Sequence, residues 1–373
     1  MPLYEQLIFD SSKCQAAIER LQQTKKPVIL FGAGIIGYYT VSFFKKIGIP
    51  IQCFCDNDVE KQKASYLGFP VIAFSDLCRC YPEACVIPTL ANYTKVFDQI
   101  SSSANSYEII YLGTVDICDD TPTNEEFVKN HIRELENVYG LLEDDLSRSV
   151  LVNILNYKLT RNPDYAKSVK SQQAIYFEPD IIALDGNSVF LDVGAFNGDT
   201  VEEFIRYAGK NSIQERPYRK IFALEPDPEN FQKLKERVLA SKWQEIECLN
   251  YGAWDTVDTL SFFTGLDCGS TTSATNRDGA MKTTTIQTET IDRIVGESKV
   301  SFIKMDVEGA EMNALKGAAS TIKRDRPLLA ISVYHKKEDI FSIPQYLKHL
   351  VPDYRLYLRH YTDTAADTVL YAK

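Results

Sequence analysis

The feature that most constrains the fold is segment 188–205, in which an apolar strand, a glycine turn and a helix start follow one another. The apolar run ends in an acid, Asp192, and Gly194 and Gly198 flank the turn. Gly194 lets the chain leave the strand without a Cβ clash, and Gly198 lets the helix begin close to a ligand. Thr200 supplies a capping hydroxyl at the helix start. The segment therefore predicts a loop that presents backbone N–H groups to a nucleotide-like ligand.

A strand–glycine–helix junction also occurs in proteins that bind nothing, so the later segments decide between the two interpretations. Four more apolar runs follow, and polar or small residues close each of them. The predicted strands with their closing turns are 220–227, 247–254, 300–309 and 327–335. In a doubly wound parallel sheet the carboxyl ends of such strands lie along one edge, where ligands bind. The sequence thus predicts an α/β fold with its site at that edge.

The residues that close these strands suit a nucleoside-like ligand. Glu225, after the second strand, can accept hydrogen bonds from both hydroxyls of a ribose. Segment 247–254 brings small residues and an aromatic side chain against a purine. The fourth strand ends in the carboxylates Asp306 and Glu308, and the fifth ends in His335.

Four segments together resemble the FkbM-type methyltransferases, namely 192–200, 224–226, 303–311 and 315–318. The resemblance extends from about Leu141 to the C-terminus. It implies a class I methyltransferase fold, with a Rossmann-like seven-stranded sheet, and S-adenosylmethionine as the cofactor. Where many members of the wider class have a middle glycine in the loop, this chain has Phe196. We expect Phe196 to pack against the cofactor or its own helix.

We predict that the cofactor contacts the strand ends and the segment before the first strand. The predicted cofactor-binding residues are Asp192, Gly194, Ala195, Phe196, Asn197, Gly198, Thr200, Glu225, Pro226, Asn250, Gly252, Ala253, Asp306 and Tyr176. Tyr176 and Phe177 are expected to cover the cofactor, because the segment before the first strand often does so in this fold. Packing in the core is the alternative role for both.

A second nucleotide-binding signature lies near the N-terminus. Segment 27–37 combines an apolar strand with a Gly-x-Gly-x-x-Gly turn formed by Gly32, Gly34 and Gly37. Asp56 closes the next strand roughly 20 residues beyond the glycines, where a dinucleotide fold places its ribose ligand. The sequence therefore predicts a smaller Rossmann-like unit before the larger one.

Segments 54–58 and 68–72 resemble the nucleotide-sugar-binding domain that precedes the β-helix of bacterial sugar acetyltransferases. Three interpretations of this unit stay open: it binds a nucleotide sugar, it binds a dinucleotide, or it serves only in structure or dimerisation.

We predict three parts along the chain. They are 1–118, Rossmann-like and nucleotide-sugar-binding-like; 119–180, a helical lead-in that covers the site; and 181–373, the methyltransferase domain. Alternating residues in 259–263 and 283–288 predict a hairpin. The loop from Gly265 to Lys282, long and rich in Gly, Ser, Thr and Asp, is expected to face the substrate.

Composition excludes several classes of function. The chain has 373 residues, of which 45% are apolar, and a formal net charge of −10. The negative charge and the absence of a basic run argue against binding to nucleic acid or to an acidic membrane surface. No apolar run in the sequence can span a bilayer, and nine cysteines, an odd number, suggest reduced thiols. We therefore expect a cytoplasmic protein, with homo-oligomerisation left open.

Methyl transfer from a sulfonium requires the acceptor, methyl and sulfur to be aligned in a dry pocket. If the acceptor is a hydroxyl, a base must take its proton, and His335 is the predicted base. Asp306 and Glu308 compete for that role, and they are also the predicted ligands if the site holds a divalent metal ion. The alternatives are helix capping or ion pairing for Glu308, and a hydrogen-bonded histidine at the sheet edge for His335.

The sequence thus predicts an S-adenosylmethionine-dependent methyltransferase that acts on a hydroxyl of a sugar, glycan or small-molecule precursor. One alternative is a non-catalytic nucleotide-sugar-binding protein with a relic cofactor pocket. Another is an NAD-linked sugar-modifying enzyme, although the sequence lacks a Tyr-x-x-x-Lys catalytic pair.

Overall fold

The computed structural model describes residues 1–113, 123–210, 217–264 and 282–373. These residues divide into two compact units. Unit 1 comprises 1–136, 149–170 and 362–366, and unit 2 comprises 137–148, 171–361 and 367–373. The division of the chain into three parts remains a prediction. Its first boundary, expected near residue 118, lies outside the described residues.

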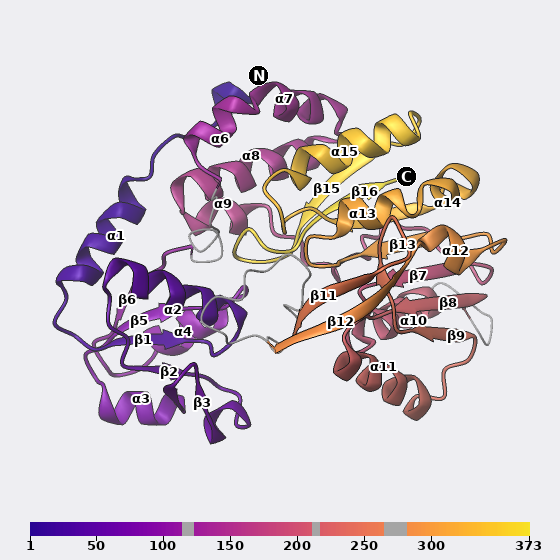
Figure 1. Cartoon of the computed structure of the whole chain (residues 1–373). Helices are drawn as coiled ribbons and strands as arrows, with labels where there is room; N and C mark the ends of the chain where they lie inside the picture. The colour runs from indigo at the N-terminus through magenta and orange to yellow at the C-terminus, as the bar shows by residue number, and fades with distance from the viewer. Residues whose placement is uncertain (114–122, 211–216, 265–281) are drawn as a thin grey trace. The chain divides into compact units, whose positions relative to one another are not determined.

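Unit 2 contains a seven-stranded sheet in the described residues, in the order β15-β16-β14-β13-β7-β8-β9 (Figure 1). The strands are β7 Val189–Val193, β8 Lys220–Leu224, β9 Ile246–Leu249, β13 Phe302–Met305, β14 Leu328–Ser332, β15 Leu356–His360 and β16 Thr368–Ala372. Strand β16 is antiparallel to both of its neighbours, and the other pairings are parallel. The predicted α/β fold with a Rossmann-like methyltransferase sheet is confirmed.

Both faces of this sheet are buried, which explains why its central strands are almost continuously apolar. On one face Phe190 of β7 and Phe302 of β13 pack in a cluster with Phe204 of helix α10 and with Phe177. Phe177 is 1% exposed and belongs to this cluster. Of the two roles considered for Phe177, the structure therefore shows packing in the core.

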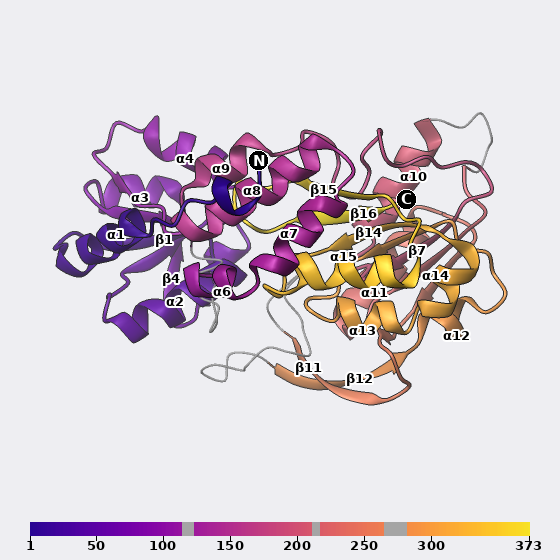
Figure 2. The ribbon, with the colours of Figure 1, turned by 90° about the horizontal axis from the view of Figure 1, so that it is seen from above.

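The helices of unit 2 cover the two faces of the sheet. They are α10 Asp199–Lys210, α11 Pro228–Ala240, α12 Ile291–Val295, α13 Glu311–Lys316, α14 Ala319–Asp325 and α15 Asp339–Leu350. Helices α13, α14 and α15 lie on the side of the sheet opposite α10 (Figure 2). Helix α11 begins where Pro228 takes the first helical position and the Asp227 side chain accepts hydrogen bonds from the N–H groups of Glu229 and Asn230.

A smaller sheet of unit 2 has the order β10-β12-β11 among the described residues. Its strands are β10 Gly252–Ala253, β11 Thr259–Thr264 and β12 Lys282–Glu289. Strands β11 and β12 pair antiparallel, as Leu260 with Ile286, which confirms the predicted hairpin. The loop expected to face the substrate, Gly265 to Lys282, lies outside the described residues except for Lys282, which begins β12.

Unit 1 is built on a six-stranded sheet in the described residues, in the order β3-β4-β2-β1-β5-β6. Its strands are β1 Val28–Phe31, β2 Cys53–Cys55, β3 Ser65–Tyr66, β4 Phe69–Ile72, β5 Cys85–Pro88 and β6 Glu108–Ile109. Its first helices are α1 Ser12–Gln23, α2 Ile35–Ile47, α3 Phe74–Cys80 and α4 Thr94–Ser101. Leu30 of β1 packs with Phe44 of α2, and Phe31 packs on the other face with Leu77 of α3. Unit 1 therefore has a buried sheet with helices on both faces.

Apolar residues at helical spacing in 4–24 and in 124–160 predict a lead helix and a helical stretch with Leu146 on its buried side, and both predictions need correction. The lead helix begins at Ser12 rather than Tyr4, since a single 3-10 turn spans Tyr4–Gln6. The stretch 124–160 is not one helix but α6 Glu125–Asn130, α7 Ile132–Leu141 and α8 Asp145–Thr160, followed by α9 Pro163–Ser168. Leu146, expected on the buried side, is 49% exposed because it lies in the first turn of α8. No helix in the described ranges combines the length and the apolar character needed to cross a membrane.

Candidate active site

The glycine turn after β7 packs tightly against the neighbouring strand ends. The N–H groups of Gly194 and Ala195 both donate to the Leu224 carbonyl, at 3.0 and 2.8 Å. Gly194 has a φ of +82°, and a Cβ at this position would collide with the carbonyl oxygen of Asp306. Only glycine therefore fits between β8 and β13 at this point.

Glu225 holds the turn from the end of β8. Its Oε2 accepts from the Phe196 N–H at 2.8 Å, and its Oε1 accepts from the Asp227 N–H at 2.8 Å. Burial raises the pKa of Glu225 to about 7, against the opposing effect of these two N–H groups. Phe196 adopts a φ of +48°, so the residue that replaces the usual glycine still takes a left-handed conformation.

A cavity of about 290 Å³ opens in front of this turn. Ten of the predicted site residues line it: Gly194, Phe196, Thr200, Glu225, Pro226, Gly252, Ala253, Asp306, Glu308 and Tyr176. They come from the turns that follow β7, β8 and β13, from the start of α10, from β10 and from the segment before β7, as expected for a site at the carboxyl edge of the sheet.

The structure places six predicted site residues outside the lining of this cavity, namely Asp192, Ala195, Asn197, Gly198, Asn250 and His335. Gly198 packs against Leu234 of α11, where a Cβ would lie 2.9 Å from a Leu234 methyl carbon. Asn250 donates through Nδ2 to the carbonyls of Glu225 and Pro226, at 2.8 and 3.1 Å. These two residues shape the wall of the cavity from behind.

Asp192 is fully buried and lies 3.1 Å from the Nζ of Lys304, its register partner on β13. Lys304 is also buried and donates to the carbonyl of Gly194 at 2.6 Å. Burial raises the pKa of Asp192 to about 6, against the opposing effect of Lys304. Asp192 therefore acts on the turn through Lys304, from beneath the cavity.

Several residues of the site were missed at the level of sequence. The cavity is also lined by Lys304, Ile286, Thr288 and Asp367. Ile286 and Thr288 are two residues apart on β12, so their side chains lie on the same face of the strand. The alternating pattern of the sequence predicts this shared face but does not show that it lines the cavity. Asp367 comes from the loop between β15 and β16, and no motif marks it.

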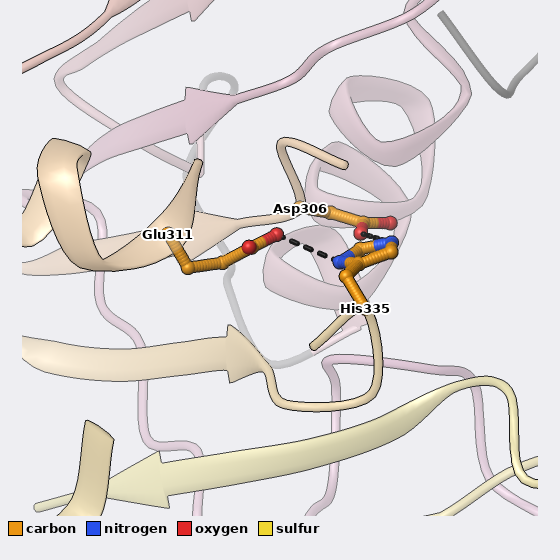
Figure 3. Close-up of side chains that lie close together, drawn as sticks. All are labelled: Asp306, Glu311 and His335. Atoms are coloured by element: carbon orange, nitrogen blue, oxygen red, sulfur yellow. Dashed lines mark hydrogen bonds and ion pairs between the residues drawn. The ribbon is translucent and has the colours of Figure 1, made fainter. Parts of the chain in front are cut away.

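A cluster of ionisable groups lies at the ends of β13 and β14. The Tyr176 hydroxyl donates to Asp306 Oδ2 at 2.7 Å. The His335 ring lies between Asp306 and Glu311 (Figure 3), with Nδ1 2.8 Å from Glu311 Oε1. His335 Nε2 lies 3.4 Å from Asp306 Oδ1 and 3.5 Å from Glu308 Oε2. The structure thus brings the predicted base and both predicted carboxylates together.

The charges in this cluster shift one another's pKa values. Burial by itself lowers the pKa of His335, but Glu311, Glu308 and Asp306 outweigh it and hold that pKa well above its usual value. Burial also raises the pKa of Asp306, yet His335 and Lys304 reverse the effect and leave it lowered. The pKa of Glu308 rises to about 8 through burial, with further contributions from Asp306 and Glu311 and opposition from His335.

The glycine turn of unit 1 repeats the arrangement around Glu225. Asp56 Oδ2 accepts from the Ala33 N–H at 2.8 Å, and its Oδ1 accepts from the Asp58 N–H at 2.9 Å. Gly32 has a φ of +127°, and a Cβ there would lie 2.6 Å from the Thr89 carbonyl oxygen.

The other two glycines of this turn differ in their surroundings. A Cβ at Gly37 would lie 2.6 Å from the Gly32 carbonyl oxygen, whereas one at Gly34 would meet only Lys61 Nζ, at 3.9 Å. The tight packing of the turn therefore requires glycine at position 37, whereas the space around Gly34 would admit a Cβ. The structure brings the four predicted residues of this second site together.

Comparison with known families decides what the larger unit is. The model of the Methyltransferase FkbM domain matches residues 192–363. This part of the chain is an FkbM methyltransferase domain. The match includes the glycine turn, Glu225 and the cluster around His335, so the enzyme is a methyltransferase that depends on S-adenosylmethionine.

Solved structures agree on the fold. An FkbM methyltransferase from Methylobacillus flagellatus KT is 22% identical to this chain, with a TM-score of 0.68, and the match covers 99% of this chain and 95% of that one. An rRNA methylase from Streptococcus thermophilus matches 51% of this chain and 87% of its own at 15% identity, with a TM-score of 0.33. An S-adenosylmethionine-dependent methyltransferase from Aquifex aeolicus matches 57% and 97% at 15% identity, with a TM-score of 0.32. The last two scores are too low to support an argument. No curated protein matches the chain.

Proposed function

We propose that this FkbM methyltransferase transfers the methyl group of S-adenosylmethionine to a hydroxyl of a sugar, glycan or small-molecule precursor. The observation that carries the proposal is the distribution of carboxylates along one cavity. Glu225 lies at the end of β8, and Asp306 and Glu308 lie at the end of β13. The first suits the ribose of the cofactor, and the other two suit an acceptor that carries hydroxyls.

The residues present fit the cofactor. The two N–H bonds to Glu225 fix its carboxylate, and its remaining lone pairs can accept from ribose hydroxyls. Gly252, Ala253 and Ile286 form a small and apolar wall that suits an adenine ring. Bound S-adenosylmethionine supplies the electrophilic methyl group, while the chain binds, orients and excludes water. The cavity volume, about 290 Å³, lies just below the range of about 300–1,000 Å³ for ligand pockets.

The cluster around Asp306 supports a position for the acceptor. The three predicted proton acceptors, His335, Asp306 and Glu308, lie together, and the two carboxylates line the cavity. A hydroxyl bound there would have an acceptor for its proton within hydrogen-bond reach. We therefore assign the acceptor hydroxyl to this side of the cavity.

The charge of the site favours a sugar over a nucleic acid. Carboxylates accept hydrogen bonds from several hydroxyls of a polyol at once, whereas they repel the phosphates of RNA. The formal net charge of −10 acts in the same direction over the whole chain.

The test is a methyl-transfer assay with the purified full chain and S-adenosylmethionine labelled in its methyl group. Acceptor mixtures of free sugars, nucleotide sugars, oligosaccharides, RNA and peptides are offered separately. We expect label in the sugar or oligosaccharide fractions and none in RNA. Transfer confined to RNA or peptide would refute the proposed acceptor class, and so would transfer to none of the mixtures by a protein that binds the cofactor.

A second binding function is proposed for unit 1, namely recognition of a nucleotide sugar. It is supported by Lys61, whose Nζ lies 3.8 Å from Asp56 and next to the open position of Gly34. A cation beside a glycine turn at a helix start suits a diphosphate. Calorimetry of the full chain with UDP- and GDP-sugars, beside Lys61→Ala, tests it. Binding that Lys61→Ala does not weaken, or no binding at all, would contradict it.

A further inference from the structure

Two carboxylate oxygens of unit 2 lie close to the same ring nitrogen beside the cavity. His335 Nε2 lies 3.4 Å from Asp306 Oδ1 and 3.5 Å from Glu308 Oε2. The other ring nitrogen, Nδ1, is turned to Glu311 Oε1 at 2.8 Å, so the imidazole is held with Nε2 toward Asp306 (Figure 3). Asp306 is held in turn by the Tyr176 hydroxyl on its other oxygen.

Two of these atoms are buried polar atoms without a hydrogen-bond partner among the described residues. They are His335 Nε2 and Asp306 Oδ1. The His335 side chain is 9% exposed, so water has little access to it. A buried polar group without a hydrogen-bond partner is costly, so an occupant that contacts both atoms would stabilise this arrangement.

The spacing of these atoms matches a coordination shell. Metal–ligand bonds to nitrogen and oxygen are about 2.1 Å long, which places neighbouring ligands of a tetrahedral ion about 3.4 Å apart. The distances from His335 Nε2 to Asp306 and Glu308 are 3.4 and 3.5 Å. The contact between His335 and Glu311 adds the carboxylate that commonly orients a ligating histidine through its other nitrogen.

The electrostatic surroundings also favour a cation. Glu308 interacts with three acids, Asp306, Glu311 and Asp367, against the single imidazole of His335. Lys304 Nζ is already committed to Asp192 and to the Gly194 carbonyl. The acids around His335 therefore outnumber the cationic groups that face them.

We propose that His335 Nε2, Asp306 and Glu308 bind one divalent cation, with Glu311 as the group that orients the imidazole. An imidazole with two carboxylates suits Mn²⁺ or Zn²⁺ better than Mg²⁺ or Ca²⁺, which prefer shells of oxygen alone. Asp306 and Glu308 line the cavity, so the open coordination positions face the acceptor. This last step rests on the proposed function, because it assigns those positions to oxygens of a hydroxylated acceptor.

The test measures cation binding without cofactor or acceptor, so it does not depend on turnover. The full chain is stripped with a chelator and titrated with Mn²⁺, whose free ion is followed by electron paramagnetic resonance. Zn²⁺ is then titrated in competition. We expect one cation per chain and at least tenfold weaker binding in Glu308→Gln and in His335→Gln. Glu311→Gln is expected to weaken binding by about 10–100-fold, as other second-layer carboxylates do.

Glu338→Gln is the matched control, since it removes a carboxylate three residues from His335 that is not one of the proposed ligands, and its binding should equal that of the wild type. The Glu308 side chain is 31% exposed, so Glu308→Gln should fold even if His335→Gln does not. The proposal is overturned if the wild type takes up neither cation, or if Glu308→Gln binds Mn²⁺ as tightly as the wild type. Parallel titration with S-adenosylmethionine separates the two ideas, because cofactor binding without cation binding refutes this inference alone.

Discussion

Gly194 is the residue at which the site is least tolerant of change. Its φ of +82° is strained for any residue with a Cβ, and the Asp306 carbonyl occupies the space that a Cβ needs. We predict that Gly194→Ala destabilises unit 2 by about 2–5 kcal/mol, from left-handed strain plus displacement of β13. Fluorescence-detected unfolding measures this effect, since both tryptophans, Trp243 and Trp254, belong to unit 2.

Gly48→Ala is the control for strain alone. Gly48 has a φ of +75°, and a Cβ there would meet nothing within 4 Å. The Gly48→Ala variant should lower the free energy of unfolding by about 1–2 kcal/mol, as measured by thermal unfolding of the chain, and should leave cofactor binding intact. A Gly194→Ala variant with wild-type stability and cofactor affinity would contradict the packing described for the turn.

The pKa of Glu225, about 7, predicts that binding of the adenosine half of the cofactor depends on pH. Hydroxyl groups of the ribose donate to the carboxylate, so a proton on Glu225 competes with them. Between pH 8 and pH 6 the dissociation constant should rise by about tenfold. Asp227 and Lys304 also face Glu225, the first raising and the second lowering its pKa.

Calorimetry with methylthioadenosine measures this effect, because that ligand carries no group that titrates in this range. A Glu225→Gln control should show equal affinity at both pH values. The same affinity of the wild type at pH 6 and pH 8 would exclude Glu225 as the ribose acceptor. The effect of pH on folding stability has the opposite sign to its effect on cofactor affinity. Between about pH 4.5 and 7 the folded chain binds one more proton at Glu225 than the unfolded chain, so Glu225 makes folding less favourable as the pH rises through that range.

At the scale of elements, the pairing of β7 with β13 determines what Asp192 does. An acid at the end of the first strand was predicted to contact the cofactor, yet the register sets it against Lys304. The sequence shows both residues but not which strands are neighbours with which register, because that depends on contacts far apart in the chain. The same limit hid the roles of Ile286 and Thr288 in the cavity.

The buried pair of Asp192 and Lys304 gives a prediction about how β7 is held to β13. Lys304→Met leaves the carboxylate of Asp192 buried without its cation, which should cost about 3–5 kcal/mol. The double variant Asp192→Leu, Lys304→Met should recover part of that loss, since it removes both charges. Denaturant unfolding followed by tryptophan fluorescence provides the values. Equal stability of Lys304→Met and the wild type would show that the pair does not hold β7 to β13.

Local patterns predicted the strands well where burial on both faces leaves a continuous apolar run, as in 189–193 and 302–305. They failed where a helix start depends on side-chain hydrogen bonds. The Asn124 side chain begins α6 and the Asp144 carboxylate accepts from the Ser147 N–H in the first turn of α8, so one predicted helical stretch became three helices. The seven-stranded sheet itself came from the family resemblance rather than from periodicity.

At the scale of the whole molecule, the chain carries two glycine turns of the same design. In each, an acid after the second strand accepts one N–H from the turn and one from the residue two positions ahead of it, Asp56 in unit 1 and Glu225 in unit 2. The sequence patterns predict that the turn of unit 2 serves the cofactor. The cavity beside Glu225 and the match of residues 192–363 to the FkbM domain support this proposal.

The most direct test of this assignment is calorimetry of the full chain with S-adenosylmethionine and S-adenosylhomocysteine, comparing the wild type with Glu225→Ala and Asp56→Ala. The two variants remove the same pair of backbone hydrogen bonds from the two turns, and circular dichroism confirms that each folds. We predict that the wild type and Asp56→Ala bind both ligands and that Glu225→Ala binds neither. Binding that survives in Glu225→Ala and disappears in Asp56→Ala would contradict the account and move the cofactor to the turn at Gly32.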